Sequence, residues 1–173
     1  MPQFRITQKF ATDCKIKQLS EPMNTIHPLD DWLIDRMYVQ RKKVAIIIHV
    51  KTTFTFFIPY VDARGAKFIP SHFKAQLAKF FYKHSLPDFA EKVTELFSHE
   101  PIFTKTVDRK ILGHLNDFKY CASYAPGDPS PVDWQKSAED INNMPVNAGT
   151  RKWGFPIEYF NELLGINLPK RKL

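Results

Sequence analysis

Short segments in which apolar and polar residues alternate mark the first third of the chain. A period of two is typical of strands, whose successive side chains point to opposite faces. The runs 32–39 and 44–50 are rich in β-branched and aromatic residues, and the charged stretch 40–43 between them predicts a hairpin turn. In the run 52–58, Phe54, Phe56 and Ile58 would share one face, although this run also fits the start of a helix. The pattern predicts strands at residues 4–7, 32–39, 44–50, 52–58 and 102–106.

Helical spacing of apolar residues replaces this alternation in most of the rest of the chain. Phe73, Leu77, Phe80 and Phe81 follow the i, i+4, i+7, i+8 pattern of a buried stripe. Ser, Asp and Pro at the starts of such runs, and Gly just past the end, are the usual boundary residues. We predict helices over 8–16, after the cap Ser71, from Pro87, after the cap Asp108, from Pro131 after the cap Ser130, and from Pro156 to just before Gly165.

Strands that come mainly before helices predict an α+β fold. We expect a small antiparallel or mixed sheet from the N-terminal half, packed against about four to five helices. At 173 residues the chain is long enough for one ordinary core. The predicted organisation is a single domain over residues 1–168, followed by a short basic tail at 169–173.

Composition excludes several classes of protein. Cys14 and Cys121 are the only cysteines and match no CxxC pattern, so neither a disulfide framework nor a zinc site is predicted. The longest apolar run, 44–50, is too short to cross a bilayer, and the N-terminus lacks the apolar region of a signal peptide. We expect a cytoplasmic protein with no membrane contact and no cofactor.

Positive charge is concentrated in one block of the chain. Residues 36–83 contain ten Lys and Arg against a single acid, Asp62, and carry +9, whereas the whole chain carries +7. Such a block is typical of a surface that meets phosphates or an acidic protein, and the alternative is a solvated lysine-rich surface. The candidate nucleic-acid-binding residues are Arg41, Lys42, Lys43, Lys74, Lys79 and Lys83.

The segment 103–120 is the main candidate for chemistry. On a helix that begins after Asp108, polar residues lie beside the apolar stripe, and Gly113 costs about 1 kcal/mol relative to Ala, which suggests close approach by another group. A helix N-terminus with nearby cations attracts phosphate, and an Asp of raised pKa can act as a base. The candidate catalytic residues are Lys105, Arg109, Asn116, Asp117 and Tyr120.

A purely structural interpretation of this segment competes with the catalytic one. Asp108 would then only cap the helix, its polar residues would bond neighbouring loops, and Gly113 would admit a crossing helix. The sequence also lacks a glycine-rich phosphate loop, GxSxG and HExxH, and so lacks the local signatures of several enzyme classes. Whether the protein is an enzyme is left open by the sequence.

The pattern Thr104-Lys105-Thr106-x-x-Arg109-x-x-Leu112-Gly113-x-x-Asn116-Asp117-Phe118 resembles that of an uncharacterised family of small bacterial proteins. The family is described as a domain of unknown function and is often found near mobile elements. The likeness extends to the segments 5–9, 142–145 and 155–156, and so to nearly the whole chain. The resemblance implies a single domain of this length and assigns no catalytic residue.

Three functional hypotheses follow. The leading one is a basic binding protein that contacts nucleic-acid phosphates with little sequence readout, because the charge is so unevenly distributed. The second is an enzyme that acts on a phosphate-bearing or nucleotide substrate through the 103–120 segment. The third is a protein-interaction module with an acidic partner, such as a toxin–antitoxin or defence-related factor.

Overall fold

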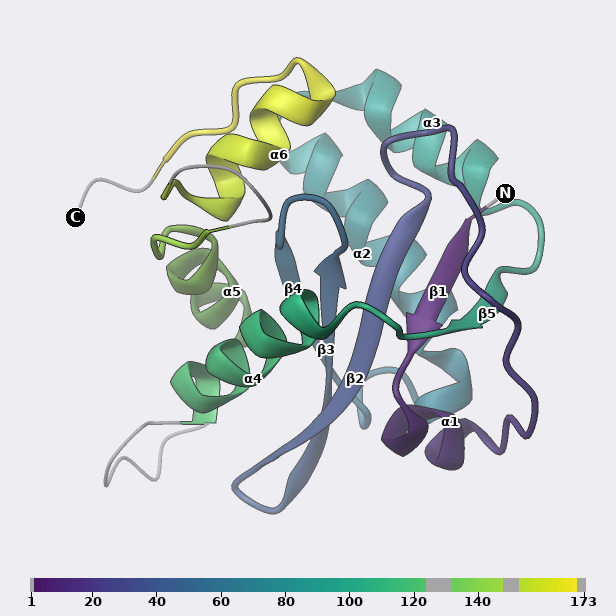
Figure 1. Cartoon of the computed structure of the whole chain (residues 1–173). Coiled ribbons are helices and arrows are strands. Elements are labelled where there is room, and N and C mark those ends of the chain that lie inside the picture. The colour runs from purple at the N-terminus through teal and green to yellow at the C-terminus, as the bar shows by residue number, and fades with distance from the viewer. Residues whose placement is uncertain (1, 124–131, 148–152, 171–173) are drawn as a thin grey trace.

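Five strands form one mixed sheet at the centre of the protein (Figure 1). The computed structural model describes residues 2–123, 132–147 and 153–170. Its sheet order is β4-β3-β2-β1-β5, with β1 parallel to both of its neighbours and β2, β3 and β4 successively antiparallel. The strands are β1 (Gln3–Ile6), β2 (Asp31–Val39), β3 (Lys42–His49), β4 (Thr55–Pro59) and β5 (Ile102–Lys105).

Helices cover both faces of this sheet (Figure 1). α2 and α3 pack against each other on one face, and α4 and α5 lie on the other. A short 3-10 turn, η1 (Ala66–Phe68), leads into α2. The helices are α1 (Gln8–Cys14), α2 (Ile69–Lys83), α3 (Pro87–Leu96), α4 (Arg109–Ser123), α5 (Trp134–Asn142) and α6 (Pro156–Leu164).

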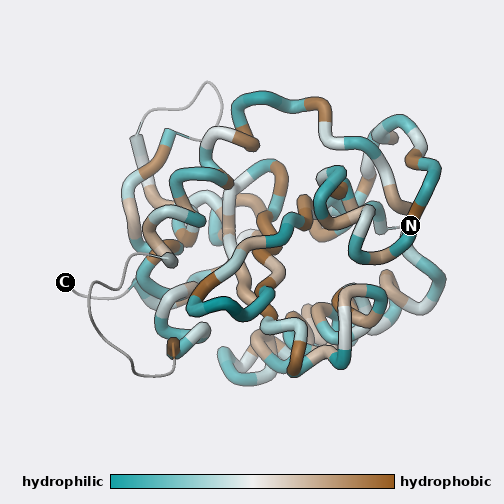
Figure 2. The backbone as a smooth tube through the Cα atoms, turned by 90° about the horizontal axis from the view of Figure 1, so that it is seen from below, coloured by the Kyte–Doolittle hydropathy of each residue, from teal (hydrophilic) through white to brown (hydrophobic). Residues whose placement is uncertain are grey.

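The α2–α3 face carries a core rich in aromatic rings. Trp32 of β2 lies 4.7 Å from Phe73 of α2 and 6.0 Å from Phe56 of β4, measured between ring centroids. These edge-to-face contacts are favourable beyond the area that they bury. Figure 2 shows the hydrophobic residues gathered along the central strands, with hydrophilic residues along the outer turns. Residues from β1 to α6 therefore share one core, and the fold depends on their joint packing.

A second core lies beneath α4 and α5. Ile111, Leu115 and Phe118 of α4 are buried against the β2–β3 part of the sheet. Lys119, on the same helix, donates a hydrogen bond to the buried carboxylate of Asp35 on β2. The apolar stripe and this ion pair together fix the position of α4 on the sheet.

The α+β prediction is confirmed, and the sheet is mixed. Its fifth strand comes from residues 102–105 rather than from the N-terminal half, and six α-helices are present in the described part of the chain. The predicted cap Ser71 is wrong, because α2 already begins at Ile69 with Pro70 in its first turn. Ser130 and Pro131 lie outside the described residues, and Asp133 caps α5 by accepting a hydrogen bond from Lys136 N at 3.0 Å.

Candidate functional site

A groove of about 400 Å³ lies between α2 and α5, along the outer edge of β4. We call it the α2–α5 groove. Its volume is within the usual range of small-molecule sites. Parts of β4, α2, α5 and the segment after α6 surround it, through Phe54, Thr55, Phe56, Gln76, Lys79, Phe80, Lys83, His84, Trp134, Gln135, Ala138, Glu139, Asn142, Asn143, Ile157, Leu168, Pro169 and Lys170.

The helical period places four groove residues on one side of α2. Residues three and four apart on a helix are neighbours on its surface, so Gln76, Lys79, Phe80 and Lys83 form a continuous row. The adjacent stripe that includes Phe73, Leu77 and Phe81 is fully buried in the core. Because that stripe holds the helix against the sheet, the row beside it is presented to the groove.

Aromatic rings make up much of the groove wall. Phe80 lies 5.6 Å from Phe54 and 5.5 Å from Phe56, between ring centroids. On the α5 side, Trp134 packs 5.5 Å from Phe57 of β4. The rings are therefore held by the core and present an apolar surface suited to a flat ligand.

Ammonium groups stand at the rim of this apolar wall. Lys79 and Lys83 are both exposed on α2. Lys170 also lines the groove, but its ammonium is 2.9 Å from a Glu158 carboxylate oxygen and 3.2 Å from the Phe155 ring centroid. Lys79 and Lys83 are therefore the groove cations best placed to meet an anionic ligand.

His84 ends α2 next to these lysines. Burial lowers the pKa of its imidazole, and the nearby Lys83 lowers it further, while Glu139 opposes the shift. The ring packs on Phe80 at 4.7 Å between centroids. At neutral pH the imidazole is therefore mostly uncharged and extends the aromatic wall.

Two asparagines hold the extended segments on either side of the groove. The Asn142 Oδ1 accepts from Thr55 N at 2.7 Å, and its Nδ2 donates to Thr55 O at 3.0 Å. Asn161 does the same for Leu168, with distances of 2.9 Å and 3.0 Å. Each side-chain amide thus bonds the backbone N–H and C=O that a neighbouring strand would otherwise bond. These contacts hold the segments that line the groove in place.

The five candidate catalytic residues do not meet at a cavity. Arg109, Asn116, Asp117 and Tyr120 are exposed along α4, and none of them lines the α2–α5 groove. Lys105, on β5, forms an exposed ion pair with Glu21 at 2.5 Å.

Gly113 does not mark a close approach. Within the described chain, no heavy atom beyond its chain neighbours and its own helix backbone lies within 4 Å of where a Cβ would be. Asp108 does cap α4, since its Oδ1 accepts from Lys110 N at 2.8 Å and from Ile111 N at 3.3 Å.

The six candidate nucleic-acid-binding residues fall on separate surfaces. Arg41 and Lys42 are exposed at the β2–β3 hairpin, whereas Lys79 and Lys83 border the α2–α5 groove. Lys74 donates to the Phe97 carbonyl at 3.1 Å. The basic block of the sequence is therefore divided by the fold.

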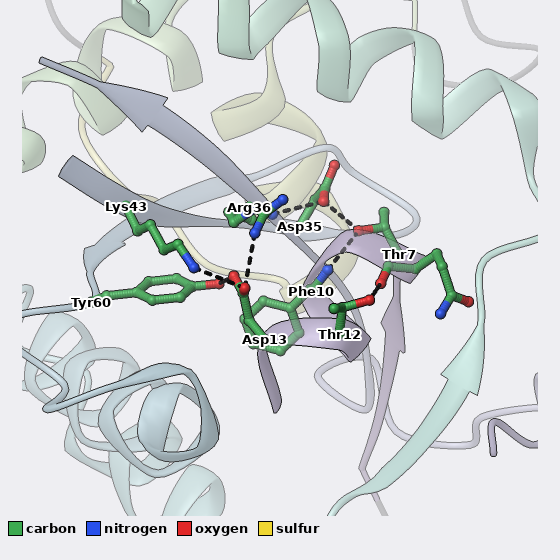
Figure 3. A network of polar contacts seen from close by, with 9 residues as sticks. Thr7, Phe10, Thr12, Asp13, Asp35, Arg36, Lys43 and Tyr60 are labelled. Carbon is green, nitrogen blue, oxygen red and sulfur yellow. Dashed lines mark hydrogen bonds and ion pairs between the residues drawn. The ribbon is translucent and has the colours of Figure 1, made fainter. Parts of the chain in front are cut away.

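Lys43 belongs to a polar network around Asp13 (Figure 3). The Asp13 carboxylate accepts from Arg36 at 2.8 Å, Lys43 at 2.9 Å and the Tyr60 hydroxyl at 3.0 Å. Burial raises the pKa of Asp13, but these hydrogen bonds and the positive charges outweigh it and hold the pKa below its usual value. The network joins α1 to β2, to β3 and to Tyr60 just after β4, which is a structural role.

The groove residues differ in how visible they are in the sequence. The polar side of α2, with Gln76, Lys79 and Lys83, follows from helical spacing, whereas Phe80 is indistinguishable from a core residue in that pattern. Asn142 gives no local signal, because its partner Thr55 is 87 positions away. Long-range pairing is what turns these residues into one site.

Two structural findings bear on cofactors and membranes. Among the described residues, no group of three or more His, Cys, Asp or Glu side chains could hold a metal ion. In the same part of the chain, every helix is too short or too polar to cross a membrane.

Comparison with known proteins identifies a family. No curated protein and no solved structure matches the chain. Residues 3–159 match the family described as a domain of unknown function, DUF6933, and the chain therefore belongs to that family.

Proposed function

We propose that the protein binds phosphate-bearing ligands that carry a flat apolar body, through the α2–α5 groove. The observation that carries this proposal is the pair of exposed ammonium groups, Lys79 and Lys83, beside a wall of aromatic rings. The ligand's ring lies against Phe80 and Trp134, and its phosphate faces the two lysines. The groove thus offers one ligand both positive charge for its phosphate and an apolar surface for its ring.

The two contributions differ in kind. Hydrogen bonds to charged groups contribute about 1.5–3 kcal/mol each, which corresponds to about ten- to a hundredfold in affinity. Contact with aromatic side chains adds about 1–3 kcal/mol for each stacked base in single-stranded nucleic acid. Neither contribution requires a particular base sequence.

This proposal retains the nucleic-acid hypothesis in a narrower form. Free nucleotides and single-stranded nucleic acid both combine a phosphate with a flat ring, whereas the rings of a duplex are stacked inside it. The groove therefore favours a free nucleotide or an unpaired strand over a duplex. Lys79 and Lys83, rather than all six candidate residues, form the phosphate-binding set.

Titration calorimetry of the full chain tests the proposal with three probes: 1-naphthyl phosphate, AMP and a single-stranded oligonucleotide. We expect Lys79→Glu and Lys83→Glu each to weaken binding at least about tenfold, because each removes an attraction and adds a repulsion. AMP and the oligonucleotide distinguish a free nucleotide from a strand as the source of the ligand.

Arg41→Glu and Lys42→Glu are matched controls. They make the same charge change within the same basic block, but on the hairpin rather than at the groove. We expect affinity close to that of the unaltered protein. Binding that depends on the hairpin substitutions and not on the groove substitutions would overturn the proposal, as would the absence of binding to all three probes.

A further inference from the structure

The side chain of Gln76 carries a polar atom that the protein itself leaves without a partner. Its Oε1 is buried, and none of the described residues hydrogen-bonds to it. Buried polar side-chain atoms normally have a partner. Gln76 lines the α2–α5 groove and is only partly buried, so a turn of its side chain brings this amide to a ligand there.

The order of residues along α2 indicates where that ligand group would lie. Gln76, Phe80 and Lys83 follow one another on the groove side, about one helical turn apart and about 10 Å from first to last. An amide, an aromatic ring and an ammonium group are thus in line. A nucleotide has the matching order of a hydrogen-bonding base edge, a flat base and a phosphate.

We propose that the flat body of the ligand is a nucleobase and that Gln76 hydrogen-bonds its edge. This inference rests on the proposed function of the groove and names the chemical class of its ligand. A glutamine amide offers one acceptor and one donor side, the combination that pairs with base edges. Gln76 is then a specificity-determining residue, which favours nucleotides over other aromatic phosphates.

Comparison of two ligands of like charge tests this role. AMP and 1-naphthyl phosphate both carry a phosphate monoester and a flat double ring, but only AMP has a base edge with hydrogen-bonding groups. We expect AMP to bind at least about tenfold more tightly to the unaltered protein, the effect of about 1.4 kcal/mol of hydrogen bonding.

Gln76→Met, which keeps an unbranched side chain and removes the amide, is the decisive variant. We expect it to abolish the preference for AMP while the affinity for 1-naphthyl phosphate stays the same or rises. The readout is a ratio of two affinities within one variant, so a general loss of folded protein does not change it. Lys83→Glu is the control, and it should lower the affinity for both ligands by a similar factor.

The possible failures are distinct. If 1-naphthyl phosphate binds at the groove and AMP binds no better, or if Gln76→Met leaves the ratio unchanged, the nucleobase inference is wrong and the proposed function stands. If neither ligand binds, the nucleobase inference is wrong, and if the single-stranded oligonucleotide also fails to bind, the proposed function is wrong as well. A preference for AMP that disappears only in Gln76→Met supports both.

Discussion

At the scale of single residues, the β2–β3 turn contains two consecutive residues in the left-handed region. Gln40 has a φ of 49° and Arg41 a φ of 64°, and together they connect the paired residues Val39 and Lys42. Two-residue hairpin turns of this kind favour Asn-Gly, because a Cβ in this region is costly. Arg41 is therefore a non-glycine residue at a position that suits glycine.

Arg41→Gly should accordingly stabilise the protein by about 1 kcal/mol. Thermal unfolding should show a rise in midpoint of about 2–4 °C for a chain of this length. Lys42→Gly is a suitable comparison, since it removes a similar charge from the next residue, which lies in strand β3. It should destabilise by about 0.5–1 kcal/mol. Equal effects of the two substitutions would show that charge, rather than turn geometry, is the cause.

Two glycines show what a local pattern can predict about a residue. Gly165 was predicted just past the last helix, and it is found there with a φ of 65°, because helix ends impose a local geometry. Gly113 was predicted to admit a neighbouring group, and none of the residues that the structure describes approaches it. The propensity of a residue depends on its own backbone, whereas its neighbours depend on how distant elements pack.

At the scale of elements, periodicity identified the strands and helices better than their ends. The shared face of Phe54, Phe56 and Ile58 is confirmed, since all three lie in the core beneath α2. The start of α2 was misplaced because Ser71 looks like a cap, while the 3-10 turn at 66–68 leads directly into the helix. At this helix start, the packing of the preceding turn determines the first residue, and the capping preference of Ser71 does not.

Asn142 of α5 supports the edge of β4 by bonding both backbone polar groups of Thr55. Asn142→Ala should leave the buried backbone N–H and C=O of Thr55 without partners, at about 1–3 kcal/mol for each group. We expect urea unfolding to show a loss of about 2–4 kcal/mol, with weaker binding at the groove. The loss of affinity follows because Thr55 and Asn142 both line the groove.

Gln135→Ala provides the control for this substitution. Gln135 lies on the same helix and donates an exposed hydrogen bond to Glu139 at 3.0 Å. Its removal should change the unfolding free energy by less than about 0.5 kcal/mol. If Asn142→Ala proves equally mild, solvent or a neighbouring group must bond the backbone N–H and C=O of Thr55. The Asn142 side chain then does not support β4.

At the scale of the whole molecule, the groove is the feature that sequence patterns could not assemble. Lys79 and Lys83 of the groove were among the candidate residues, but the pattern grouped them with the hairpin, because all six candidates belong to one basic block. The catalytic candidates on α4 were grouped by a helical wheel, which correctly places them on one side of the helix. That side faces solvent, because α4 packs on the sheet through its apolar stripe. The helical wheel alone does not show whether another element covers the polar side.

Acid stability is a further property of the whole molecule, and a buried histidine and a partly buried aspartate, each with a lowered pKa, contribute to it. His49 donates through Nε2 to the Pro28 carbonyl at 2.6 Å, and its Nδ1 lies 2.9 Å from the Thr52 hydroxyl. Burial lowers its pKa from 6.5 to about 4, against the opposing effect of the Pro28 hydrogen bond. The pKa of Asp13 is also lowered, through its network with Lys43, Tyr60 and Arg36.

The sign of the pH dependence follows from proton binding. Between pH 6.5 and about 4, His49 binds a proton in the unfolded chain but not in the folded protein, so stability falls as the pH drops through this window. The full effect is about 3 kcal/mol. Asp13 contributes stability above the usual carboxyl pKa and loses it at still lower pH, as the folded protein takes up the proton.

Urea unfolding at a series of pH values should therefore show a loss that begins near pH 6.5, well above the range in which carboxylates titrate. His49→Gln should lower stability at pH 7, because it disturbs the Thr52 and Pro28 contacts, but it should flatten the slope between pH 6.5 and 4. His99→Gln, at an exposed position, should leave both the stability and the slope unchanged. An unchanged slope in His49→Gln would assign the acid sensitivity to another group, because the buried imidazole can produce this dependence only if it stays uncharged in the folded protein.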